Sequence, residues 1–195
     1  MTRRQNVSWL VAVVAMLAAG CGIEQSHSYI QSNDGSLSFR HPPDWAEVDV
    51  QALGLEWVTG IDASGSPSGE HATTFVQAQP FVVAQVLPLD QERHDQASRS
   101  VLRTLAIADG RDPIAGDDPT IRILFYEDVL DDRGFEGHHV RFEIDIDGDT
   151  AIAEHLAVLD PDRTRIQRLR VACTTVCFEA NSAAIEDIFD SVRFR

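Results

Sequence analysis

In the stretch FEGHHVRFEIDIDGDTAIAEHLAVL, residues 135–159, apolar and polar side chains alternate before the dipeptide Asp147-Gly148, and mostly apolar side chains follow it. Alternation with a period of two is typical of a β-strand, and Asp-Gly favours a two-residue hairpin turn. Pairing the two arms through this turn sets Val140 opposite His155. The apolar side of the first arm then consists of Val140, Phe142, Ile144 and Ile146. The stretch therefore predicts a long antiparallel hairpin with one apolar face.

A third strand is predicted immediately before this hairpin, at Ile121–Leu130. We expect the four-residue loop 131–134 to join the two segments. This loop sets Ile123 beside Phe142 and Phe125 beside Val140, so that apolar residues share one face.

A fourth strand is predicted after the hairpin, at Arg165–Cys173. A five-residue loop, 160–164, sets Leu169 beside His155. We reject a four-residue loop because it would place Arg168 and Arg170 on the apolar side. The result is a four-strand antiparallel meander with one apolar face, which a helix is expected to cover.

Shorter elements are predicted on both sides of the meander, and together they indicate an α+β fold in a single domain, residues 28–195. The expected helices cover 91–108 and 181–190, the second with Asn181 as N-cap and Ile185, Ile188 and Phe189 on one face. The expected extended segments are 28–31, 36–40, 55–59, one or two strands in 73–87, and 192–195.

The N-terminus has the features of a leader that is removed. Arg3 and Arg4 precede the apolar run Trp9–Ala19, which is shorter than the roughly 20 residues of a transmembrane helix. Ala18-Ala19-Gly20 runs directly into Cys21, and this tetrapeptide resembles the bacterial lipoprotein box, in which a peptidase cuts before the cysteine and its sulfur carries a diacylglycerol.

This resemblance implies that residues 1–20 are a signal peptide and that the mature chain begins at lipidated Cys21. Residues 21–27 would be a short tether, and the domain would lie on the outer face of the cytoplasmic membrane, in the cell envelope. An ordinary signal peptide with an incidental cysteine is the alternative. Thr2-Arg3-Arg4 also leaves twin-arginine export open beside general secretion.

The chain is acidic, with a formal net charge of −15. Removal of residues 1–20 takes away two arginines and no acid, which changes the charge to −17. This excess argues against nucleic acid or anionic lipid as the main partner. The basic residues are 16 arginines with no lysine, which suggests a GC-rich coding sequence and an actinobacterial source, or else a haloarchaeal one.

Two segments resemble the PsbP-like proteins, which include the plant photosystem II extrinsic subunit and many bacterial lipoproteins. They are the opening SLSFRHPPDW, residues 36–45, and the closing IEDIFDSVRF, residues 185–194. His41 replaces the usual aromatic residue before Pro42. The resemblance implies a central antiparallel sheet flanked by helices. It also implies a non-catalytic binding or assembly module for an envelope protein or a small ligand, with no catalytic residues and no cofactor.

Cys173 and Cys177 are the only cysteines besides Cys21. A close pair in an exported protein indicates a disulfide, and a metal site is the alternative.

A second hypothesis is an enzyme or a metal site. In the predicted register Glu127 lies opposite His138, with His155 diagonally across, and two histidines and a carboxylate are suitable metal ligands. The alternative is a polar end to the apolar face, with the histidines hydrogen-bonded or hydrated. Residues 145–150 (DIDGDT) lack the later residues of a calcium loop and predict a hairpin turn instead. No G-x-S-x-G motif is present.

Overall fold

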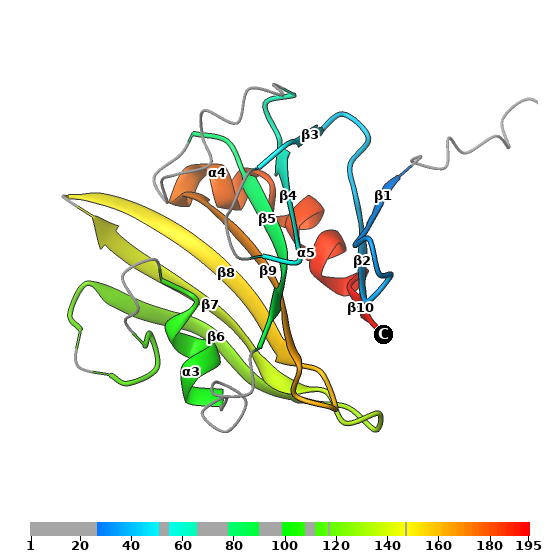
Figure 1. Cartoon of the computed structure of the whole chain (residues 1–195). Coiled ribbons are helices and arrows are strands. Elements are labelled where there is room, and N and C mark those ends of the chain that lie inside the picture. Colours follow the sequence, from blue (N-terminus) through cyan, green and yellow to red (C-terminus); the bar gives the residue numbers. More distant parts are fainter. Residues whose placement is uncertain are drawn as a thin grey trace, which may run out of the picture.

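The computed structural model describes residues 27–50, 55–65, 78–89, 99–107, 112–116, 118–146 and 148–195 (Figure 1). The strands are β1 (Ser28–Gln31), β2 (Leu37–His41), β3 (Ala46–Val48), β4 (Trp57–Asp62), β5 (Phe81–Pro88), β6 (Ile121–Leu130), β7 (Glu136–Ile146), β8 (Asp149–Leu159), β9 (Arg165–Thr174) and β10 (Arg193–Phe194). The helices are α3 (Arg99–Thr104), α4 (Thr175–Ala180) and α5 (Ser182–Asp190). Within these ranges, no helix is both long and apolar enough to span a membrane.

Two antiparallel sheets dominate the structure. The larger has seven strands in the order β3-β4-β5-β9-β8-β7-β6, and the smaller has three in the order β1-β2-β10. The predicted meander forms one half of the larger sheet and is its longest part (Figure 1). The helices are few and short, so the fold is more sheet-dominated than the α+β prediction implied.

The central hairpin β7–β8 has the predicted register, with Val140 opposite His155. Near its open end Gly137 allows the two backbones to approach closely. A Cβ atom at Gly137 would stand 2.0 Å from the Ala157 carbonyl oxygen, so only glycine fits there without displacing the strand.

The predicted register between β6 and β7 is correct before the middle of β6 and wrong after it. Ile123 lies opposite Phe142 as predicted, but a β-bulge follows, and Tyr126 rather than Phe125 then lies opposite Val140. The bulge absorbs one extra residue on β6. The Asp131 amide donates to the Phe135 carbonyl at 3.1 Å, so the connecting loop differs by one residue from the predicted 131–134.

The register between β8 and β9 is the one that the sequence analysis rejected. Arg170, not Leu169, lies opposite His155. The loop is closed by a hydrogen bond from the Asp160 amide to the Arg165 carbonyl, at 3.1 Å. The Asp160 carboxylate also accepts from the amides of Thr164 and Arg165, at 2.7 and 2.9 Å, which stabilises this tighter loop.

Both faces of the large sheet are covered, whereas the prediction covered only one. One face packs on α4, α5 and the small sheet, with Leu169 and Val171 of β9 among the contacting residues. The other packs on Ala106 and Ile107, which follow α3, through Val140 and Phe142. We refer to these as the α5 face and the α3 face. In β8 nearly every residue is buried, because each side of the strand meets a packed layer.

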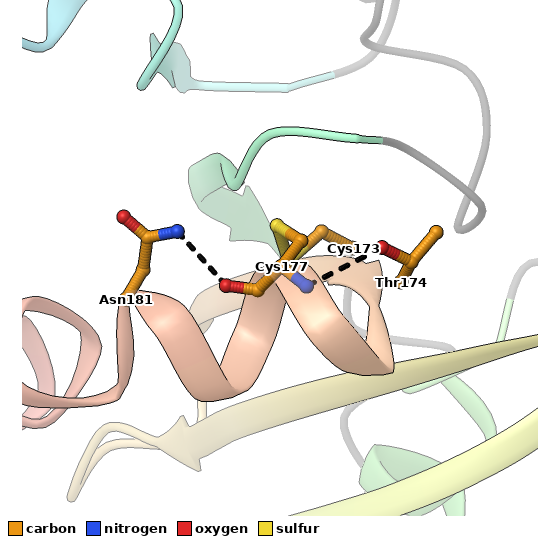
Figure 2. The surroundings of a disulfide bond; sticks show 4 residues. All are labelled: Cys173, Thr174, Cys177 and Asn181. Carbon is orange, nitrogen blue, oxygen red and sulfur yellow. Dashed lines mark hydrogen bonds between the residues drawn. A yellow bond between two sulfur atoms is a disulfide. The ribbon is translucent and has the colours of Figure 1, made fainter.

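The C-terminal region contains one helix more than predicted. α5 begins after Asn181 as expected, with Ile185, Ile188 and Phe189 buried. α4 precedes it, and the Thr174 hydroxyl accepts from the Cys177 amide at its N-terminus (Figure 2). A disulfide joins Cys173 at the end of β9 to Cys177 in α4, and the Asn181 side chain donates to the Cys177 carbonyl at 2.8 Å (Figure 2). The strand is thereby fixed to the helix that covers it.

The remaining predicted elements agree in part. β1 and β2 lie where expected and pair with each other, while the closing segment pairs with β2 as β10. β4 lies slightly later than its predicted range, and α3 falls inside the predicted helix 91–108. Residues 1–26, including Cys21, residues 91–98 and the turn residue Asp147 lie outside the described residues.

Candidate functional site

The three candidate metal ligands do not come together. The bulge in β6 places Glu127 opposite His139 instead of His138, so the predicted pairing is wrong. The Glu127 carboxylate lies 3.5 Å from His139 Nδ1 on the α5 face. His138 and His155 do meet, on the α3 face, with 3.2 Å between Nε2 and Nδ1. Among the described residues, no group of three potential metal ligands is formed.

A buried carboxylate organises the α5 face. Glu154 in β8 is 1% exposed and accepts from His139 Nε2 at 2.7 Å and from Arg141 Nε at 2.9 Å. The His139 ring stacks on Phe189 of α5, and the Arg141 guanidinium lies over the Phe178 ring of α4. The negative charge is thus compensated beneath the helices, which is the arrangement that a buried ion pair requires.

Two arginines of β9 lie on the α3 face, close to the paired histidines. The observed register places Arg168 and Arg170 on the same side of the sheet as His155. Arg168 donates to the Gln85 side chain of β5 and, at 3.3 Å, to the Leu105 carbonyl. Both acceptors are neutral, and no carboxylate contacts Arg168 in the part of the chain that the structure describes.

A small cavity of about 30 Å³ lies between these side chains. It is lined by Val83, Gln85, His155, Arg168 and Arg170. His155 is completely buried, and its Nε2 has no hydrogen-bond partner among the described residues. Because a buried polar atom normally has a partner, this nitrogen is available to a group within the cavity.

Burial determines the protonation of the groups around the cavity. Burial, the contact with His138, which keeps both rings from being protonated together, and the charge of Arg168 hold the pKa of His155 well below 6.5. Burial and the Arg103 charge lower the pKa of His138 to about 4. Burial and the Arg170 charge lower the pKa of Arg168 to about 10, and burial also lowers the pKa of Arg170. At neutral pH the imidazoles are therefore neutral and the guanidiniums charged.

A larger hollow of about 600 Å³ lies at the other end of the molecule, bordered by His27, residues 42–44, and the C-terminal helices. Its charged groups compensate one another, because Asp187 of α5 pairs with both Arg40 and His27. The cavity on the α3 face is the more informative site, since its buried polar groups are incompletely satisfied.

Only three of the residues that line this cavity stand out in the sequence, and the predicted register separates them. It places His155 with His138 as a candidate metal ligand on the apolar face, and it places Arg168 and Arg170 on the opposite face. The signal that finds the site is the loop 160–165, in which Asp160 at one end and Thr164-Arg165 at the other favour the tighter connection.

Three solved structures are similar to this one at low sequence identity. Cyanobacterial PsbP (CyanoP) from Synechocystis is 11% identical, with a TM-score of 0.57, and the match covers 90% of this chain and 96% of that protein. A mutant of the protein Mog1 is 7% identical, with a TM-score of 0.51 and coverage of 87% and 96%. LpqN of Mycobacterium tuberculosis, which is involved in cell envelope biogenesis, is 12% identical, with a TM-score of 0.47 and coverage of 86% and 89%.

Neither a protein-family model nor a curated protein sequence matches the chain. The likeness to LpqN is too weak to support an argument. The likenesses to CyanoP and Mog1 concern the fold alone, because fold similarity at such identities does not carry function. The chain has the PsbP-like fold that its opening and closing segments predicted.

Proposed function

We propose that the protein is a lipid-anchored module of the cell envelope that binds another envelope protein and has no catalytic activity of its own. In this proposal residues 1–20 are removed and Cys21 carries the lipid. The tether 22–27 then holds the domain within about 20–25 Å of the membrane surface. The support for this location is the lipoprotein-like sequence around Cys21.

The observation that supports protein binding is the β6 edge of the large sheet, which pairs with no further strand among the described residues. β6 is ten residues long and is the last strand in the sheet order. Ile123, Leu124 and Phe125 near its middle are 37–39% exposed. A long edge strand with exposed apolar side chains is a template for pairing with an extended segment of another chain.

We assign this edge to a basic segment of a different protein, not to a second copy of the chain. With a net charge of −15, two copies repel each other. The edge strand carries its own acidic group, because the Glu127 side chain is 55% exposed. The bulge after Ile123 also interrupts the regular backbone that symmetric strand pairing requires.

Site-specific photo-crosslinking in intact cells tests this assignment. A photoreactive residue at Leu124 is expected to yield one discrete crosslinked protein. The matched control is the same residue at Val176 of α4, which is 77% exposed but lies away from β6. Adding Phe125→Lys to the Leu124 variant is expected to abolish the crosslink, since it introduces a repelling charge at the apolar centre.

Three outcomes contradict the assignment: no crosslink from Leu124, the same products from Val176, or a crosslink that survives Phe125→Lys. A crosslink between two copies of the chain would replace the partner by a homodimer. Anchoring is tested separately, because Cys21→Ser is expected to move the protein from the membrane fraction to the soluble fraction. If the Cys21→Ser protein stays in the membrane fraction, the lipid anchor is excluded.

A further inference from the structure

We propose that the cavity on the α3 face, lined by Gln85, His155, Arg168 and Arg170, binds the carboxylate group of a small organic acid. This site is separate from the β6 edge and does not depend on the function proposed above.

The charge beside the cavity favours an anionic ligand. Arg168 is half-buried on the α3 face, its only acceptors among the described residues are the neutral Gln85 side chain and Leu105 carbonyl, and desolvation together with the Arg170 charge disfavours its ionised form. Taking a cation out of water is costly unless an anion compensates it. An anionic group in the cavity supplies that compensation, and no described carboxylate does so for Arg168.

The free nitrogen of His155 also favours such a ligand. Its Nδ1 lies 3.2 Å from His138 Nε2, and of two neutral imidazoles in contact one donates and the other accepts. When His138 donates, the His155 proton resides on Nε2, the atom without a partner. His155 then adds a neutral N–H donor to the charged guanidinium of Arg168. A charged donor and a neutral donor beside one cavity match the acceptor-only character of an ionised carboxylate.

The volume of the cavity limits the size of the group that it can enclose. By the measure in which a single water needs about 10–15 Å³, the cavity admits roughly two or three water-sized atoms. The three heavy atoms of a carboxylate group match this space if the rest of the acid stays outside the cavity, whereas phosphate and sulfate are compact groups of five heavy atoms that exceed it. Guanidinium groups also bind carboxylates through two parallel hydrogen bonds, which gives them geometric preference as well as charge.

The test uses the purified protein and sodium acetate as the probe, with chloride and phosphate as comparison anions at constant ionic strength. We expect acetate to raise the melting temperature saturably, and phosphate to give no saturable increase. In imidazole nitrogen NMR, acetate is expected to shift the His155 Nε2 resonance and to leave His41 unchanged. The NMR measurement needs no variant, so it remains valid if substitutions in the cavity impair folding.

Arg168→Gln is expected to weaken acetate binding about tenfold or more, since it removes a charged donor. The control is Arg165→Gln on the same strand, whose side chain pairs with Asp34 and Glu56 away from the cavity. The proposal is overturned if acetate shifts neither the melting temperature nor His155, or if Arg168→Gln and Arg165→Gln respond equally. An equal response to acetate and phosphate overturns the assignment to a carboxylate.

Discussion

Glu154 and His155 are neighbours in β8, are both almost completely buried, and face opposite sides of the sheet. On the α5 face, Glu154 is paired with Arg141 and His139, so that opposite charges meet. On the α3 face, His155 is neutral and borders a cavity with two arginines, and no carboxylate of the described residues contacts Arg168. The two residues are adjacent and equally buried, but their charged neighbours differ.

This difference separates a structural role from a binding role. The Glu154 cluster is closed, since aromatic rings of α4 and α5 cover its basic partners. On the α3 face, Arg168 contacts only neutral acceptors among the described residues, and a cavity lies beside it. A compensated buried charge therefore indicates a structural role, whereas a half-buried cation beside a cavity, with no described counterion, indicates a candidate binding site.

The largest effect is expected from breaking the closed cluster. Glu154→Gln removes a buried carboxylate and leaves the half-buried guanidinium of Arg141 without its counterion, and we expect a loss of about 3–5 kcal/mol in the free energy of unfolding. Urea denaturation measures this loss. Glu143→Gln is the matched control, because Glu143 pairs with the exposed Arg122 on the neighbouring strand and is expected to cost less than about 1 kcal/mol. If both variants lost the same free energy of unfolding, the pairing of Glu154 with His139 and Arg141 would contribute no more to stability than an exposed ion pair.

Acidification is expected to act on the other face. The pKa of His138 is about 4 in the folded protein, and that of His155 also lies well below its ordinary value of 6.5, because both are buried. Below about pH 6.5 the unfolded chain therefore binds more protons than the folded one, and stability falls as the pH falls toward 4. For His138 alone this loss amounts to about 3 kcal/mol over that window.

The measurement is the free energy of unfolding between about pH 6.5 and pH 5, where most ordinary carboxylates are still ionised. His138→Asn should reduce the slope of the free energy of unfolding against pH. Arg103, Asp112, Tyr126 and Asp128 also face His138, so the control is the same slope in Asp112→Asn. An unchanged slope in His138→Asn would show that the buried imidazoles do not carry the acid sensitivity.

The sequence specified the parts of the fold that depend on local alternation and turn chemistry. The β7–β8 hairpin was predictable because Asp147-Gly148 fixes its turn and the apolar residues of one arm share a face. The short strands β1 and β2 and the helix after Asn181 were predictable for similar reasons. The opening and closing segments also pointed to the PsbP-like fold.

The candidate site could not be predicted, because the rule that placed its residues assumes a single covered face. Arg168 and Arg170 were kept off the apolar side, yet both faces of β9 are covered, so burial gives no preference between the two registers. The hydrogen bonds of Asp160 decide the register instead. The bulge in β6 has no local signal in the sequence that we can identify, and it moved Glu127 to the other face.

Replacing an arginine on the α3 face should cost far less than breaking the closed cluster. Arg168→Met removes the hydrogen bonds that Arg168 donates to Gln85 and to the Leu105 carbonyl, but it also removes a cation that desolvation disfavours. These effects offset each other, and we expect a change within about 1 kcal/mol in either direction. Urea denaturation without added anion checks this. A loss as large as that of Glu154→Gln would mean that Arg168 is structurally compensated, which contradicts the contrast between the two faces.

The smallest effect is expected at Glu127, the carboxylate that the sequence placed beside the histidine pair. It lies 3.5 Å from His139 Nδ1 with more than half of its side chain exposed, so solvent screens the interaction. Glu127→Gln should change the free energy of unfolding by less than about 0.5 kcal/mol and leave the response of His155 to acetate unchanged. Denaturation and imidazole NMR on this one variant measure both. If the acetate response changed, the two faces would be coupled through β7, where His138 and His139 are adjacent, and the cavity could no longer be treated as independent of the cluster beneath the helices.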